Sequence, residues 1–126
     1  MATLIDQEFF ARLNALNDKF AAGIPDTLGR LHTARTQFSA AAPDAALVRE
    51  LHQILHTVAG SAATFGFRVL GQEARQLEQR LRVLMAFEHI AASDWENWLA
   101  ALDAYIAWGL HDPRAASFGD GAERPH

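Results

Sequence analysis

Apolar residues recur in this chain at the spacing of an α-helix, and this periodicity constrains the fold more than any other feature of the sequence. Comparable apolar faces run from Phe9 to Phe38, from Leu70 to Leu84 and from Trp95 to Ile106. The face in the middle of the chain consists of Leu47, Leu51, Ile54, Leu55, Val58, Ala62 and Phe65. No segment shows the strict alternation of a half-buried strand. The sequence therefore predicts an all-α fold.

The first helical segment crosses two residues that weaken helices. From Ile5 to Phe38 the apolar residues keep one helical phase across Gly23 and Pro25. Proline lacks the backbone donor that a helix interior uses, and its ring crowds the preceding turn. We therefore predict either one kinked helix or two helices in line, with a bend or short break between residues 21 and 25.

Turn residues separate the segments that follow. Residues 39–43 predict a tight connection, after which Asp44 is favourably placed near the N-terminus of a helix that runs to about Thr64. Gly66 is typical of a helix stop. The next helical pattern begins so soon after Gly66 that the two helices should form an antiparallel hairpin.

The last helix has the clearest start signal in the sequence. Ser93 and Glu96 have the spacing of a capping box, in which the hydroxyl and the carboxylate each bond a free backbone N–H group of the first turn. Gly109 and Pro113 predict the end of this helix.

Four amphipathic helices with short connections predict an up-and-down antiparallel four-helix bundle, because this arrangement buries all four apolar faces. We expect the bundle to occupy residues 1–111. Residues 112–126 have no apolar period and are rich in residues that break secondary structure. We expect them to form a disordered C-terminal tail.

Composition argues against several classes of partner. The chain has 126 residues and a formal net charge of −4 at pH 7, without a cluster of Lys and Arg, so we expect neither nucleic acid nor a membrane as a partner. It contains no cysteine, which excludes disulfides and thiolate metal sites. There is no basic, apolar signal segment and no run of about 18 apolar residues. We expect a single-domain, cytoplasmic monomer.

One histidine lies on the side of its helix that faces away from the predicted core. His56 falls opposite the apolar face of its helix, with His52 one turn before it and Gly60 one turn after it. Ala59 and Ala63 lie beside it. Glycine costs about 1 kcal/mol relative to alanine in a helix, and Glu or Lys is the usual residue on a solvated face. The small side chains therefore indicate that another molecule approaches His56 closely.

The stretch HTVAGSAATFGF, followed by a leucine, an alanine and a Leu-Glu pair, resembles the signature of the histidine phosphotransfer (HPt) domains of two-component phosphorelays. The residues that carry the resemblance are His56, Gly60, Ser61, Ala62, Gly66, Leu70, Ala74, Leu77 and Glu78. It implies a helical bundle whose exposed histidine accepts a phosphoryl group from a receiver-domain aspartate and passes it to another receiver. It also implies a phosphotransfer protein without an ATP site rather than a stand-alone kinase.

The resemblance implies roles for particular residues. It implies that His56 is the phosphoryl acceptor and donor. From their positions on the helix, we expect Ala59, Gly60 and Ala63 to form the surface on which the receiver docks, and His52 to belong to this surface or to be solvated. The partners are receiver domains of response regulators or of hybrid histidine kinases. The chain needs no cofactor of its own, because Mg²⁺ is expected in the receiver, where metal and lysine supply alignment and charge neutralisation.

The chain departs from the family pattern at one position. The family usually carries a lysine three residues after the histidine, where it can pair with phosphoryl oxygens, and this chain has Ala59. Arg75 and Arg82 on the following helix are candidates to supply the missing positive charge.

Two other functions remain open. A receiver-binding module with the same fold but no phosphoryl transfer would keep the docking surface. A metal site is suggested by the i, i+4 spacing of His52 and His56, but no Glu-x-x-His pair accompanies them and both are expected to face outward.

Most of the remaining aromatic and charged residues have a structural interpretation. We expect the three tryptophans, Trp95, Trp98 and Trp108, to form the core and its edge. Arg80 belongs with Arg75 and Arg82 to a solvated face. We expect Glu73 and Glu78 to solvate helix edges or to pair with arginines.

Overall fold

The computed structural model describes residues 4–118, and these form a four-helix bundle without strands. The elements in chain order are α1 (Leu4–Gln37), α2 (Ala45–Ser61), the short 3₁₀-helix η1 (Ala62–Phe65), α3 (Arg68–Met85) and α4 (Ala92–His111). Contacts form between α1 and α2, α2 and α3, α3 and α4, and α1 and α4. Helices that follow one another in the chain are therefore neighbours in space, as the periodicity predicts for an up-and-down bundle.

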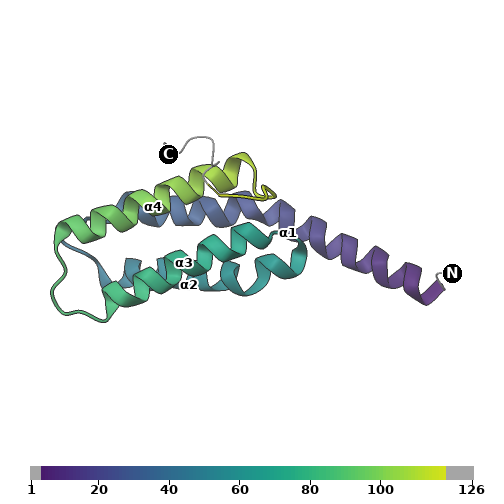
Figure 1. Cartoon of the computed structure of the whole chain (residues 1–126), viewed down its shortest axis with the longest axis horizontal. Helices are drawn as coiled ribbons and strands as arrows, with labels where there is room; N and C mark the ends of the chain where they lie inside the picture. Colours follow the sequence, from purple (N-terminus) through teal and green to yellow (C-terminus); the bar gives the residue numbers. More distant parts are fainter. Residues whose placement is uncertain (1–3, 119–126) are drawn as a thin grey trace.

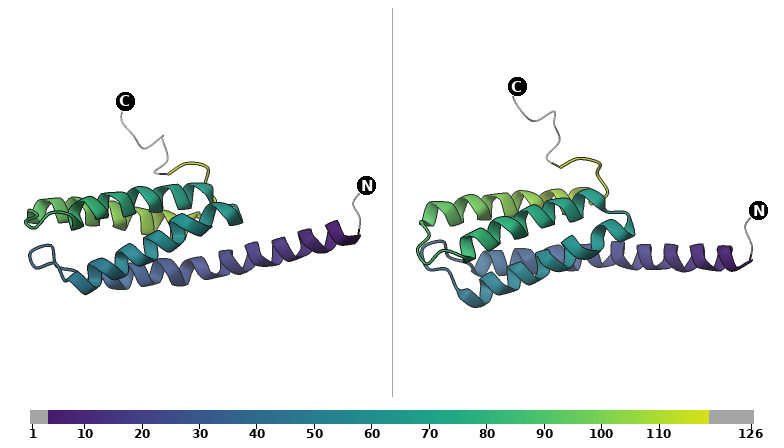
Figure 2. Two further views of the ribbon diagram at one scale, coloured as in Figure 1. Left: turned by 90° about the horizontal axis from the view of Figure 1, so that it is seen from below. Right: turned by 60° about the horizontal axis from the view of Figure 1, so that its bottom comes forward.

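The long helix α1 extends past the ends of the other helices at its N-terminal part (Figures 1 and 2). Its 34 residues form one α-helix that contains Pro25. The expected break between residues 21 and 25 does not occur, so the alternative of two helices in line is wrong. Pro25 is exposed, and the buried residues Ile24 and Leu28 on the adjacent face hold the helix against the bundle on both sides of it.

Both ends of α2 are defined by specific local structure. Asp44 caps α2, since its carboxylate accepts hydrogen bonds from the N–H groups of Ala46 and Leu47 at 2.7 and 3.3 Å. At the other end the chain tightens into η1 over the last residues that we expected to be α-helical. Gly66 then reverses the chain with φ 90°, a conformation that glycine adopts without steric cost.

The start of α4 differs from the capping box expected at Ser93. The helix begins at Ala92, and its N-cap is Ala91, which makes no side-chain hydrogen bond. The carbonyl of Ala91 accepts bonds from the N–H groups of Asp94 and Trp95 at 3.0 and 3.4 Å. Because the first turn starts before Ser93, the Ser93 hydroxyl lies too far into the helix to cap it.

Gly109 does not terminate α4, which continues to His111. It is buried, and a Cβ atom at this position would lie 2.8 Å from Leu28 Cδ1 and 3.3 Å from Leu70 Cδ1. The glycine is therefore a packing residue that lets α4 approach α1 and α3, and not the stop that the sequence indicated.

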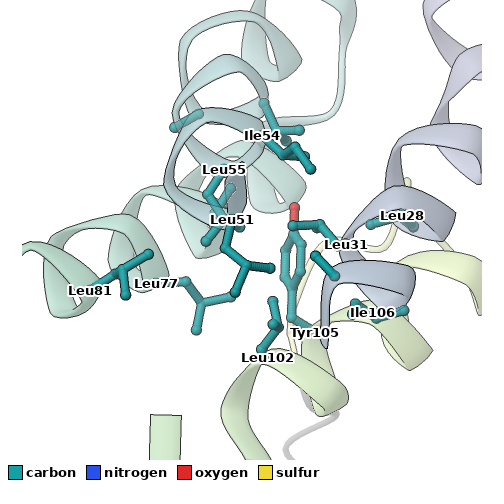
Figure 3. Packing of buried hydrophobic residues seen from close by; sticks show 14 of the residues in the cluster. Leu28, Leu31, Leu51, Ile54, Leu55, Leu77, Leu81, Leu102, Tyr105 and Ile106 are labelled. Atoms are coloured by element: carbon teal, nitrogen blue, oxygen red, sulfur yellow. The ribbon is translucent and has the colours of Figure 1, made fainter. Parts of the chain in front are cut away.

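Leucine, isoleucine and aromatic side chains from all four helices fill the core (Figure 3). Trp95 and Trp98 are buried and Trp108 is half-buried, in agreement with the expected core and core edge. Two polar aromatic groups of α4 bond backbone carbonyls of α3. Trp98 Nε1 donates to the Leu77 carbonyl at 3.0 Å, and the Tyr105 hydroxyl donates to the Leu70 carbonyl at 2.9 Å.

Residues 112–118, the first part of the expected disordered tail, lie against the bundle. The Arg114 guanidinium carbon lies 4.4 Å from the centre of the Phe67 ring, and Phe118 packs edge-on against Trp108. Trp108 Nε1 also donates to the Ser117 carbonyl at 3.2 Å. Residues 119–126 lie outside the described residues, so the disorder of the tail as a whole stays a prediction.

Candidate functional site

His56 lies on the side of α2 that faces α3, and its side chain is 59% exposed. The apolar positions of α2 turn toward the core and leave this face to solvent, as the periodicity predicts. Its Nδ1 atom lies 2.7 Å from Oε2 of Glu78 on α3. The imidazole is therefore exposed to a partner and held in place from one side.

Glu78 is the buried charged residue of this face, with only 5% of its side chain exposed. Besides His56, its Oε2 atom lies 3.3 Å from His52 Nε2 and 3.5 Å from Arg82 Nη2. The expectation that Glu78 solvates a helix edge is wrong, although its pairing with an arginine is confirmed. The sequence carries a signal for this burial: Glu78 lies one turn after Ala74, about 40° away on a helical wheel and within the apolar arc.

The contact between Glu78 and His56 determines which ring nitrogen of a neutral His56 carries the proton. A carboxylate accepts hydrogen bonds and does not donate them, so the proton of a neutral His56 lies on Nδ1. The lone pair is then on Nε2, at the other side of the exposed ring. Carboxylates orient histidines in this way in metal and catalytic sites, where they fix the tautomer.

The surface beside His56 is open on the C-terminal side of α2. A Cβ atom at Gly60 would meet nothing within 4 Å, and Ala63 is exposed. Ala59 differs from the expectation, because it is 8% exposed and belongs to the core. Small residues bring α2 and η1 close to α3 here: a Cβ at Gly71 would lie 3.2 Å from Ala62 Cβ. The burial of Ala59 follows from that close approach.

Both candidate arginines come from α3 and flank Glu78, Arg75 three residues before it and Arg82 four residues after it. Arg75 Nη2 donates to the Ala59 carbonyl at 3.2 Å. Arg82 Nε donates to His52 Nε2 at 3.4 Å, and its side chain is 60% exposed. The structure thus brings both arginines beside α2, one turn to either side of the level of His56.

His52 is more enclosed than the exposed position expected for it. Its side chain is 23% exposed, and its ring stacks on that of His56 with 6.0 Å between centroids and 13° between planes. Among residues 4–118 no group of three or more His, Cys, Asp and Glu residues is arranged to hold a metal ion.

An apolar groove runs between α1 and α2 on the neighbouring face. Its volume is about 380 Å³, and Phe20, Ile24, Ile54 and Val58 contribute to its wall. Thr57, the residue after His56, also lines it. None of the helices in the described part of the chain combines the length and apolar character needed to cross a membrane.

A protein-family model described as the Hpt domain matches residues 15–107. The chain belongs to the Hpt family. The match runs from the first third of α1 to the last turns of α4 and includes every residue of the site around His56. No match is found among curated proteins or among solved structures.

Membership of the Hpt family has a direct functional meaning. An Hpt domain implies a phosphotransfer role in phosphorelays, and Hpt domains typically interact with receiver domains. The family assignment inferred from the sequence is therefore confirmed, and so is the helical bundle that it implied. The Hpt match says nothing of individual residues, so the roles within the site rest on the geometry.

Proposed function

We propose that this Hpt domain is a phosphorelay intermediate, in which His56 accepts a phosphoryl group from a receiver-domain aspartate and passes it to another receiver. One observation carries the proposal: the His56 ring is 59% exposed while its Nδ1 atom is held 2.7 Å from a buried carboxylate. A histidine with no function has no use for a buried carboxylate partner, which is costly to desolvate.

The transfer step uses both ring nitrogens. The Nε2 lone pair forms the bond to phosphorus as the bond from phosphorus to the aspartate oxygen breaks, and the aspartate leaves as a carboxylate. The Nδ1 proton stays in place, so the phosphorylated ring carries a positive charge. Glu78 lies beside that charge and stabilises it. Mg²⁺ in the receiver neutralises phosphoryl oxygens during transfer.

The docking surface that we propose combines Gly60 and Ala63 with the exposed edge of His52. A receiver must bring its aspartyl phosphate close to Nε2, and the absence of a side chain at Gly60 leaves room for its backbone. The apolar groove between α1 and α2 adjoins this surface through Thr57 and offers area for contact. Ala59 is excluded from direct docking by its burial.

Phosphoryl transfer from a panel of phosphorylated receiver domains tests the proposal. The full chain and His56→Gln are incubated with each receiver, and the modified residue is located by mass spectrometry under non-acidic conditions. We expect label on His56 in the wild type and none in the variant. Binding of a receiver without label on His56 would instead support a docking module that does not transfer.

The docking surface has its own test. Gly60→Leu places a large side chain where a receiver should approach, and we expect transfer to His56 to be lost while the melting temperature does not fall below that of the wild type. Gly60→Ala is the matched control, because a single methyl group leaves most of the space open. Unchanged transfer in Gly60→Leu would contradict docking at this surface.

A further inference from the structure

A single oxygen atom connects four side chains of the site. Glu78 Oε2 lies 2.7 Å from His56 Nδ1, 3.3 Å from His52 Nε2 and 3.5 Å from Arg82 Nη2. His56 takes the short contact, and the other two groups share the remaining capacity of the oxygen. A movement of Arg82 away from Glu78 therefore changes the charges and hydrogen-bond partners next to His52.

Arg82 is a hydrogen-bond donor to His52 in this structure. Its Nε–H group donates to His52 Nε2 at 3.4 Å, which requires a lone pair on that nitrogen. His52 is then neutral, with its proton on Nδ1. In this state His52 Nε2 and Glu78 Oε2 are two acceptors 3.3 Å apart, and the guanidinium of Arg82 donates to one and lies close to the other.

Phosphorylation of His56 disturbs this arrangement. A phosphoryl group adds about 1.5 to 2 negative charges at neutral pH and three acceptor oxygens, which arginine binds in a bidentate manner. Arg82 is 60% exposed and comes from the helix that faces His56, so its side chain is free to turn toward the new anion. When it turns, Glu78 and His52 Nε2 are left as two facing acceptors without the cation between them.

We propose that His52 takes up a proton when His56 is phosphorylated. The protonated His52 then takes the place of Arg82 as the cation beside Glu78, in addition to the positively charged phosphohistidine ring. The proposal rests on the phosphorylation of His56 proposed above. A proton from solvent binds His52 Nε2, and the resulting N–H group donates to Glu78 Oε2 across the present 3.3 Å separation.

The groups that act on His52 are few. Glu78 and Arg82 contact it from α3, and His56 stacks on it from α2 itself. The phosphorylated His56 ring carries a positive charge that opposes uptake by His52, but Glu78 and the phosphoryl group place greater negative charge around it.

Histidine titration by NMR tests the proposal on the full chain. Protein labelled with ¹⁵N in its histidines is titrated before and after phosphorylation with phosphoramidate, and the titration midpoint of His52 is compared. We expect phosphorylation to raise that midpoint by about one pH unit, which shifts the phosphorylation equilibrium about tenfold over the range of uptake. His89, which is exposed in the connection between α3 and α4, is the internal control and should not shift.

Arg82→Gln separates the role of the arginine from a direct effect of the phosphoryl charge. Without Arg82, His52 should already donate to Glu78, so its midpoint is raised before phosphorylation and rises little further afterward. Label on His56 with an unchanged His52 midpoint overturns the proposal and leaves the relay function intact. Label on no residue, or on His52 instead of His56, overturns both.

Discussion

Glu78 and Tyr105 are both buried polar side chains, yet they serve opposite purposes. The Tyr105 hydroxyl donates to the backbone carbonyl of Leu70, between α4 and α3. Glu78 accepts from His56, a side chain that reaches solvent, between α3 and α2. A backbone partner belongs to the scaffold and cannot move independently, whereas a side-chain partner can titrate, turn or be modified. The comparison therefore favours a structural role for the α3–α4 contact and supports the functional role that we propose for the α2–α3 face.

The protonation of Tyr105 agrees with its structural role. Burial, with a smaller contribution from the charge of Glu73, raises the pKa of Tyr105 far above its usual value. The phenol stays protonated in the folded protein and remains a donor to Leu70.

Glu78→Gln should lower the rate of phosphoryl transfer to His56 by about 10- to 100-fold, the range seen when carboxylates that orient histidines are removed. The glutamine amide donates to Nδ1 and favours the tautomer with the proton on Nε2, which removes the nucleophilic lone pair. Single-turnover transfer from a phosphorylated receiver measures the effect. Glu88→Gln, at an exposed position, is the control. A wild-type transfer rate in Glu78→Gln would contradict the proposed role of Glu78 in transfer.

Tyr105→Phe should do the reverse, destabilising the fold by about 1 to 2 kcal/mol through loss of a buried hydrogen bond while leaving the transfer rate unchanged. Denaturant unfolding measures the stability. The variant should also differ from the wild type in alkali. Above about pH 10 the unfolded wild type loses the tyrosine proton that the folded form retains, so its unfolding free energy falls by up to about 1.4 kcal/mol per pH unit. This component should be missing in Tyr105→Phe.

Gly109→Ala should lower the unfolding free energy by about 1 kcal/mol. The new Cβ would lie 2.8 Å from Leu28 Cδ1, and Leu28 is only 1% exposed and cannot turn away without disturbing the core. The cost of such overpacking, about 1 to 3 kcal/mol, exceeds the helix propensity gained. Gly60→Ala has the same propensity gain in open space and should be stabilising by up to about 1 kcal/mol. If Gly109→Ala and Gly60→Ala changed the unfolding free energy by the same amount in thermal unfolding, the packing role of Gly109 would be contradicted.

Ser93→Ala should have the smallest effect, below about 0.5 kcal/mol, because α4 begins before this residue and its cap is Ala91. Loss of a true N-cap costs about 1 kcal/mol. Thermal unfolding distinguishes the two values, and a loss of 1 kcal/mol would restore the capping box that the sequence indicated.

Periodicity predicted the four helices, their order and the exposure of His56, because these depend on which face of each helix is apolar. The burial of Ala59 and Glu78 was missed, since it depends on how closely α2 and α3 approach. The packing role of Gly109 was missed for the same reason, because a glycine that ends a helix and one that lets a neighbouring helix approach look alike in sequence. Contacts between helices determine these features, and the pattern of one helix does not contain them.

Pro25 divides the backbone hydrogen bonds of α1, because it has no N–H group to donate to the carbonyl one turn earlier. Before it, Phe9 and Phe10 are exposed, and the N-terminal part of the helix extends past the bundle (Figure 1). After it, Leu28 and Leu31 are buried. Amide hydrogens of the extension should therefore exchange rapidly with solvent by local fraying, while those beyond Leu28 exchange only when the whole bundle opens. The N-terminal extension of α1 should therefore fray without opening the bundle.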